Sequence, residues 1–89
     1  MKAVVTVVGK DQVGIIAAVC NRLAEYNVNV LDISQTVMQG YFTMMMVVDV
    51  AACNIPLGEL CEKMEQAGKE RNLSIRVQRE DIFEAMHRI

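Results

Sequence analysis

The sequence has no tryptophan, one histidine and no apolar run that approaches the length of a membrane span. A transmembrane helix needs roughly 18 consecutive apolar residues, and the segment from Met1 to Val8 is too short for the apolar region of a signal peptide. We therefore expect a cytoplasmic protein. Because His87 has no second ligand at metal-binding spacing, the sequence also argues against a metal site.

Cysteine is present, but not in a pattern that carries chemistry. Cys20, Cys53 and Cys61 are odd in number and lack paired Cys-x-x-Cys spacing, and Cys20 and Cys61 fall on apolar stripes of predicted helices. We expect small buried hydrophobic residues rather than disulfides or metal ligands. No phosphate-binding loop, dinucleotide fingerprint or catalytic triad is visible. The sequence therefore predicts no enzyme activity and no cofactor.

An excess of charge of one sign is also lacking. The net charge is −2, and acidic and basic residues are interspersed along the chain. A nucleic-acid-binding protein presents a basic face or stripe to the phosphate backbone, and this sequence has none. We therefore expect neither nucleic acid nor a membrane among its partners.

Aliphatic side chains are what the sequence has in abundance. Apolar residues make up 53% of its 89 residues, and only 4% are aromatic. A chain of this length forms one domain, residues 1–89, and such a domain buries only about 60% of the surface of its unfolded chain. This is more apolar surface than a small two-layer domain easily hides, so we expect a homodimer or a higher oligomer.

Hydrophobic periodicity predicts six regular elements and a short seventh. In chain order they are a strand at 3–9, a helix at 13–26, strands at 28–38 and 41–50, a helix at 56–70, a strand at 73–79 and a short helix from 81 to 87 or beyond. The strands at 3–9 and 41–50 are apolar on both faces, which is typical of central strands. The other two alternate with polar residues and are predicted to be edge strands.

A faint internal repeat supports this order. The run from Glu25 to Val30 is similar to the run from Glu70 to Ile75, at an offset of 45 residues. Two β-α-β halves with right-handed crossovers predict an α+β, ferredoxin-like fold. Its four-stranded antiparallel sheet has the order 2-3-1-4, both long helices lie on one face, and a short C-terminal helix follows.

The first half contains a distinctive turn between its strand and its helix. We expect Gly9 to end the strand, Asp11 to cap the helix and Gly14 to let another backbone or a small ligand approach. A helix start carries unpaired N–H donors and partial positive charge, which suits a carboxylate. An ordinary capped turn is the alternative interpretation. Asn29, at the start of the second strand, is expected to lie beside this turn.

The run from Val7 to Ile15, followed by Asn29-Val30 and then Phe42, resembles ACT domains. These are small ligand-sensing modules attached to enzymes and regulators of amino-acid metabolism. The resemblance covers nearly the whole chain, and the ending at 82–89 is similar to that of free-standing bacterial and archaeal ACT proteins of unknown function.

The resemblance implies an amino-acid site at a subunit interface. Its residues would be Gly9, Lys10, Asp11, Gln12, Val13, Gly14, Ile15, Asn29 and Val30. Gly14 would permit close approach, Asp11 would contact the ligand's amino group or cap the helix, and Asn29 would bind the ligand from the neighbouring subunit. Val13 stands where proline is common, and Gly9 where some serine-sensing members have histidine, which counts against serine as the ligand.

The resemblance favours a regulatory amino-acid-binding domain that acts through oligomerisation. A ligand-free protein–protein interaction module of the same fold is the first alternative, and a small ferredoxin-like enzyme is the second. The central strands carry apolar residues on both faces, for example Val4 and Val8 against Val5 and Val7. We therefore expect a second subunit to cover the sheet face away from the helices, together with the C-terminal helix of either chain.

Overall fold

The computed structural model describes residues 1–81, so the predicted C-terminal helix with Ile82, Phe83, Met86, His87 and Ile89 lies outside the described residues. The elements are β1 (Lys2–Lys10), α1 (Ile15–Glu25), β2 (Asn29–Met38), β3 (Tyr41–Asp49), α2 (Leu57–Lys69) and β4 (Leu73–Arg79). Each agrees with its predicted counterpart to within one or two residues.

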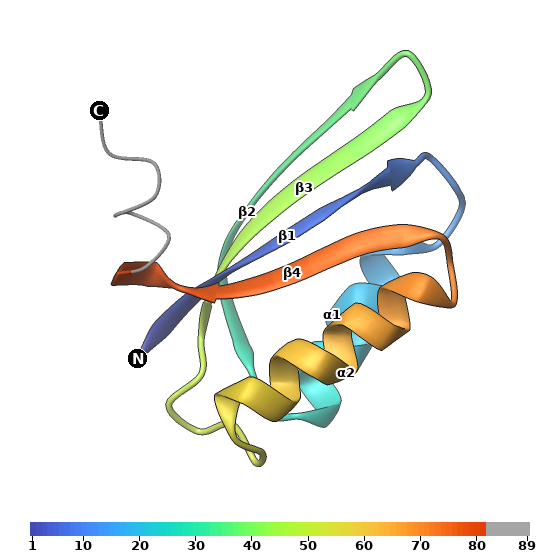
Figure 1. The fold of residues 1–89 in the computed structure, drawn as a ribbon. Helices are drawn as coiled ribbons and strands as arrows, with labels where there is room; N and C mark the ends of the chain where they lie inside the picture. Colours follow the sequence, from blue (N-terminus) through green and yellow to red (C-terminus); the bar gives the residue numbers. More distant parts are fainter. Residues whose placement is uncertain (82–89) are drawn as a thin grey trace.

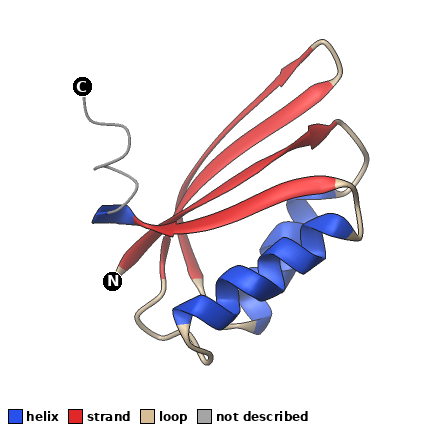
Figure 2. Cartoon of the chain, viewed as in Figure 1, coloured by secondary structure: helices blue, strands red, loops and turns tan. Residues whose placement is uncertain are grey.

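The four strands form one antiparallel sheet in the order β2-β3-β1-β4, and both helices lie on the same face of it (Figures 1 and 2). The predicted ferredoxin-like βαββαβ fold is confirmed. Val5 pairs with Met46 on one side and with Val77 on the other, so β1 and β3 are the central strands. β2 and β4 each pair with only one strand, so they are the edge strands, as their polar residues predicted.

The core fills the space between the sheet and the two helices. Met44 and Met46 are 0% exposed, whereas Met45 lies on the other face and is 41% exposed. This alternation is the period of two that a strand imposes. From the helices, Leu23 and Leu60 reach the same layer and are also fully buried. Met44 and Met46 thus belong to the core, whereas Met45 does not.

The internal repeat has a counterpart in the backbone. Asn27 and Asn72 both follow a helix and have positive φ angles of 59° and 57°. Asparagine tolerates this left-handed conformation, which ends a helix and turns the chain into the next strand. Gln39 and Gly40 also have positive φ angles, 50° and 82°, as a tight hairpin between β2 and β3 requires.

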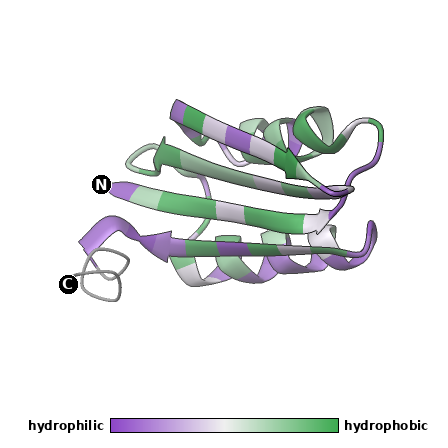
Figure 3. Cartoon of the chain, turned by 90° about the horizontal axis from the view of Figure 1, so that it is seen from above, coloured by the Kyte–Doolittle hydropathy of each residue, from purple (hydrophilic) through white to green (hydrophobic). Residues whose placement is uncertain are grey.

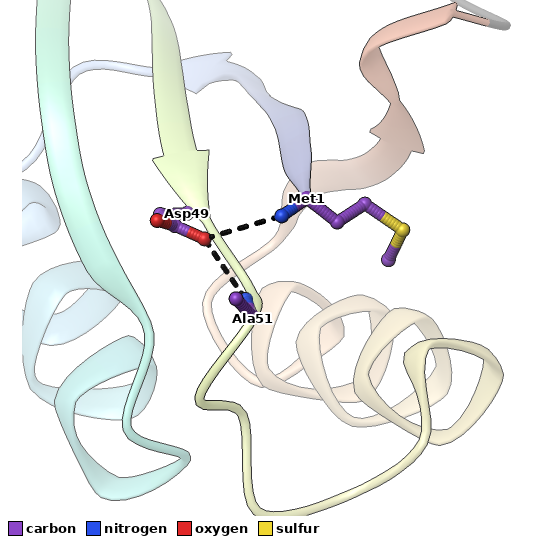
Figure 4. Close-up of polar contacts among 3 residues, drawn as sticks. All are labelled: Met1, Asp49 and Ala51. Atoms are coloured by element: carbon purple, nitrogen blue, oxygen red, sulfur yellow. Dashed lines mark hydrogen bonds and ion pairs between the residues drawn. The ribbon is translucent and has the colours of Figure 1, made fainter.

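Asp49 fixes the end of the sheet at which β3 terminates (Figure 4). Its Oδ1 accepts a hydrogen bond of 2.9 Å from the backbone N–H of Ala51 and lies 3.6 Å from the Met1 amino nitrogen. The hydrogen bond from Ala51 is the largest cause that holds the pKa of Asp49 below its ordinary value, and the Met1 charge adds to it.

Candidate functional site

The turn between β1 and α1 is anchored to two other loops. The backbone N–H of Asp11 donates to the carbonyl of Gly40 over 2.8 Å, and the side-chain amide of Gln12 donates to the carbonyl of Arg71 over 3.0 Å. The turn therefore lies between the β2–β3 hairpin and the loop that enters β4. Val13, between these anchors and the helix, is 97% exposed.

The predicted helix cap is wrong. α1 begins at Ile15, its N-cap is Gly14 in the left-handed region at φ 84°, and no side chain caps it. Asp11 does not reach this position because its own backbone is still bonded to the hairpin, three residues before the cap. The first turn of α1 contains no acidic residue. Its N–H donors are therefore not matched by any side-chain oxygen or acid of that turn.

Gly9 and Gly14 differ in backbone conformation and in surroundings. Gly9 lies inside β1, opposite Phe42 and Leu73, so it does not end the strand as expected. A Cβ there would lie 2.5 Å from Cδ2 of Leu73 and 3.2 Å from the carbonyl oxygen of Asn72, so a larger residue fits only if the Leu73 side chain moves. A Cβ on Gly14 would meet no atom within 4 Å, so its positive φ is the reason for glycine, and the space beside it is open.

Two other predicted site residues have contrasting positions. Lys10 is the last residue of β1, pairs with Tyr41 and is exposed. Ile15 is 2% exposed and belongs to the core, so its side chain cannot reach a ligand, although its backbone N–H is at the helix start. Of the predicted turn, Lys10, Asp11, Gln12, Val13 and Gly14 are accessible.

The expectation that Asn29 lies beside this turn is wrong within one chain. Asn29 pairs with Asp49, which pairs with Lys2 at the start of β1. Lys10 is eight residues further along β1, a separation of about 26 Å at 3.3 Å per residue. β2 runs parallel to β1, so the two strands start at the same end of the sheet and the turn leaves the other end. Val30 also lies at the Asn29 end and packs half-buried against the core.

β2 is an edge strand as predicted, but the exposure of its aliphatic residues was not predicted from the sequence. Nine of its ten residues are exposed, among them Leu31 at 47%, Ile33 at 40%, Val37 at 54% and Met38 at 68%. The hairpin that β2 forms with β3 stands clear of both helices (Figure 1). The sequence did contain a signal of this exposure. Aliphatic residues lie among the polar residues of this strand, and exposure of aliphatic side chains to water is unfavourable unless a partner covers them.

Of three cavities among the described residues, none is lined by residues 9–15 of the turn, and one is lined by the β2–β3 hairpin to which the turn is bonded. One of about 870 Å³ lies between β4 and α2, and its lining includes Cys61, Glu65 and Lys69. The Cys61 thiol donates to the carbonyl of Val77 over 3.2 Å. Burial raises the pKa of the Cys61 thiol, which disfavours the thiolate that nucleophilic chemistry needs. All three cysteines are free and packed against the core, but each is half-buried and not fully buried as predicted.

Within residues 1–81, no three His, Cys, Asp or Glu side chains gather in a way that could hold a metal ion. In the same part of the chain, no helix is both long enough and apolar enough to cross a membrane.

Comparison with known proteins identifies relatives over the full length of the chain. A UPF0237 protein of Listeria innocua is 49% identical over 89 residues and is covered completely, as is this chain. A UPF0237 protein of Bifidobacterium longum is 54% identical over 88 residues, which cover 99% of this chain and 98% of the relative. An archaeal UPF0237 protein from Methanocaldococcus jannaschii is 46% identical over 88 residues, with coverage of 99% and 98%.

Solved structures with the same fold include an ACT domain protein and a domain of an enzyme. An ACT domain protein from Streptococcus pneumoniae superimposes with a TM-score of 0.83 at 46% identity, over 98% of each chain. A formyltetrahydrofolate deformylase from Pseudomonas syringae shares the fold over 27% of its own length, with a TM-score of 0.79 at 23% identity and 88% coverage of this chain. The family model described as "ACT domain" matches residues 2–78. The chain therefore belongs to the ACT-domain family and, within it, is a relative of the UPF0237 proteins.

Proposed function

We propose that this protein is a cytoplasmic, regulatory ACT domain that binds an amino acid between two copies of itself. The observation that carries the proposal is β2, an edge strand with nine exposed residues out of ten. Exposed edge strands with aliphatic side chains are templates for pairing with another strand. The fold itself is a regulatory ligand-binding fold, and its occurrence in a putative glycine cleavage system transcriptional repressor fits this role.

Antiparallel pairing of β2 with β2 of a second copy explains how the separated halves of the site could meet. In such a pair, the start of one strand lies beside the end of the other. Asn29 of the second copy then lies near Met38, which pairs with Tyr41, the neighbour of Lys10. The turn of one chain and Asn29 of the other thus share one end of the joined sheet.

The chemistry of these groups suits a free amino acid. The start of α1 has no side-chain cap and no acid in its first turn, so its N–H groups can receive the α-carboxylate. The exposed Asp11 carboxylate, three residues before Gly14, can pair with the ammonium group. Asn29 of the second copy offers both a donor and an acceptor to the remaining polar groups.

Regulation follows from the shared position of the ligand. A ligand that binds only where two copies meet stabilises the associated form, and the stabilisation grows as the ligand concentration rises above its Kd. In this proposal, a partner enzyme or regulator binds the associated form and not the single chain. We propose no catalysis, because the described residues do not assemble a nucleophile, a base and an orienting group in one cavity.

A thermal-shift screen against the twenty amino acids tests the proposal, and calorimetry measures the affinity of any hit. Asn29→Ala should weaken binding by about 1–3 kcal/mol through a lost polar contact. Gly14→Asn keeps a residue that tolerates positive φ but places a side chain beside the helix start, and it should also weaken binding. Asn21→Ala, on an exposed face of α1, is the control. Unchanged affinity in both site variants would remove the turn and Asn29 from the site.

The ligand-free interaction module remains the second candidate, because exposure of β2 alone supports it. In that case the chain associates, yet none of the twenty amino acids raises its melting temperature.

A further inference from the structure

A cavity of about 260 Å³ lies between α1 and α2 and reaches down to β4. β4 alternates between buried and exposed residues, which Figure 3 shows as bands of hydrophobic and hydrophilic residues. Its buried residues Leu73 and Ile75 line the cavity together with Val19 of α1, and none of the three is more than 5% exposed. Because they are almost fully buried, they form the deepest part of the lining. The cavity therefore has an aliphatic floor.

Two alanines on the two helices leave this space open. Ala18 of α1 and Ala67 of α2 both line the cavity, and both are half-buried. Well-packed protein interiors contain few voids larger than a water molecule, because larger side chains fill such space. The cavity is slightly smaller than the range of about 300–1,000 Å³ that is typical of ligand pockets. Its size therefore suits a small metabolite.

Four charged side chains, two of each sign, also line the cavity. Arg22 and Glu25 come from α1, whereas Glu70 and Arg71 follow each other at the end of α2. Nη2 of Arg22 and Oε1 of Glu70 are 3.6 Å apart, which is longer than the roughly 2.7–2.9 Å of a charge-assisted hydrogen bond. Within residues 1–81, the ion pairs include neither Glu25 nor Arg71. The charges of this rim sum to zero, which suits a ligand that carries both signs.

The backbone of Arg71 is held by two hydrogen bonds. Its N–H donates to the carbonyl of Gly68 over 3.0 Å, and its own carbonyl accepts a hydrogen bond of 3.0 Å from the side-chain amide of Gln12. A binding group on a backbone that is already fixed loses less conformational freedom when a ligand binds. The Arg71 guanidinium is therefore a suitable partner for a carboxylate.

We propose that the cavity between the helices binds an amino acid with an aliphatic side chain, which rests on the aliphatic floor while the two charged groups of the ligand pair with the rim. The α-carboxylate binds Arg71 and Arg22, and the ammonium group binds Glu25 and Glu70. A ligand with only one of these groups leaves charges of the other sign without a new partner. This site lies within one chain and uses neither the β1–α1 turn nor β2, so it does not depend on the proposed function.

Calorimetry on the full chain with a set of small probes tests the chemistry of the ligand. The set consists of leucine, isoleucine and valine, together with glycine, isocaproate and isopentylamine. Glycine lacks the side chain of leucine, isocaproate lacks its ammonium group and isopentylamine lacks its carboxylate. We expect at least one of the three aliphatic amino acids to bind, and each of the other three probes to bind at least tenfold more weakly. Equal affinity for isocaproate or isopentylamine would contradict the assignment of the rim.

Substitutions in the cavity locate the site. Ala67→Leu fills the space and should abolish binding, whereas Arg71→Gln removes the cation but keeps the carbonyl that Gln12 binds, and should weaken binding by about tenfold or more. Ala17→Leu and Lys69→Gln are the matched controls, because both residues are exposed on the helices and neither lines the cavity. Both controls should bind like wild type. Circular dichroism confirms that each variant is folded.

The same ligands distinguish this cavity from the proposed site at the turn. Binding that is lost in Ala67→Leu and weakened in Arg71→Gln, but kept in Asn29→Ala, supports the cavity. Binding that is weakened only in Asn29→Ala supports the turn and overturns the proposal for the cavity. Unchanged affinity in both cavity variants, or no binding of any of the three aliphatic amino acids, also overturns it.

Discussion

Close contact between α2 and β4 depends on a single glycine. Gly68 is buried near the end of α2, and a Cβ there would lie 2.6 Å from the carbonyl oxygen of Leu73. Gly58, at the start of the same helix, has open space around its Cα. Helix propensity alone favours alanine at both positions. The two glycines therefore separate the effect of propensity from the effect of packing.

Replacement of these glycines by alanine should change stability in opposite directions. Gly68→Ala should destabilise the fold by about 1–3 kcal/mol, because the helix must move away from β4. Gly58→Ala should stabilise it by up to about 1 kcal/mol. Urea unfolding of both variants measures the difference. A Gly68→Ala variant as stable as Gly58→Ala would mean that the contact with β4 relaxes without loss.

The Asp49 carboxylate links stability to pH. Its pKa is lower in the folded chain than the ordinary 3.8, chiefly through the hydrogen bond from Ala51. Its contribution to stability is therefore fully present above that ordinary value and is lost as the pH falls through the lowered folded pKa. Asp49→Asn keeps an acceptor for Ala51 and removes the titration. Unfolding free energies measured from about pH 5 to pH 2 should depend less steeply on pH in the variant; parallel curves would contradict this.

At the scale of elements, the start of α1 and strand β2 depart from the simplest expectation. α1 begins with a left-handed glycine and no side-chain cap, although caps are the common way to satisfy the first N–H groups of a helix. β2 leaves its aliphatic residues in water. A ligand could accept hydrogen bonds from the uncapped N–H groups of α1, and a second chain could cover the aliphatic residues of β2. The functional proposal therefore depends on these two features.

Substitutions at Gly14 measure how much its left-handed backbone conformation costs in stability for a residue with a Cβ. Gly14→Ala should destabilise the fold by about 1–2 kcal/mol, because in the left-handed region a Cβ lies too close to the following carbonyl oxygen. Space is not the reason, since nothing lies within 4 Å of the added Cβ. Gly14→Asn should lose less, because asparagine adopts this conformation more readily. Thermal unfolding ranks the three chains, and equal losses for alanine and asparagine would contradict the assignment.

At the scale of the whole molecule, the edge strand β2 is a surface without cover in the described part of the chain, because nine of its ten residues are exposed. The single chain therefore has the form of a building unit, and its ligand site is completed in our proposal only when two such units join.

Sequence alone determined the elements and their order. Hydrophobic periodicity and the 45-residue repeat are local signals, and right-handed crossovers allow few ways to join the elements. The turn was also recognisable as distinctive. The cap at Asp11 was predicted wrongly, because a hydrogen bond from its backbone to Gly40, in a distant hairpin, holds it away from the helix.

Only the tertiary structure decided how far apart the site residues lie and which surfaces stay open. Asn29 is separated from the turn because β2 runs parallel to β1; the predicted order 2-3-1-4 already implied this direction, and the register of the strands sets the distance. Gly9 lies against Leu73 and Asn72, which are far from it in sequence, whereas Gly68 lies against the carbonyl of Leu73 across the turn that enters β4. The aliphatic residues of β2 are exposed because the helices do not extend over that hairpin (Figure 2). Each of these facts depends on the distance between elements. Packing determines that distance, whereas sequence periodicity does not.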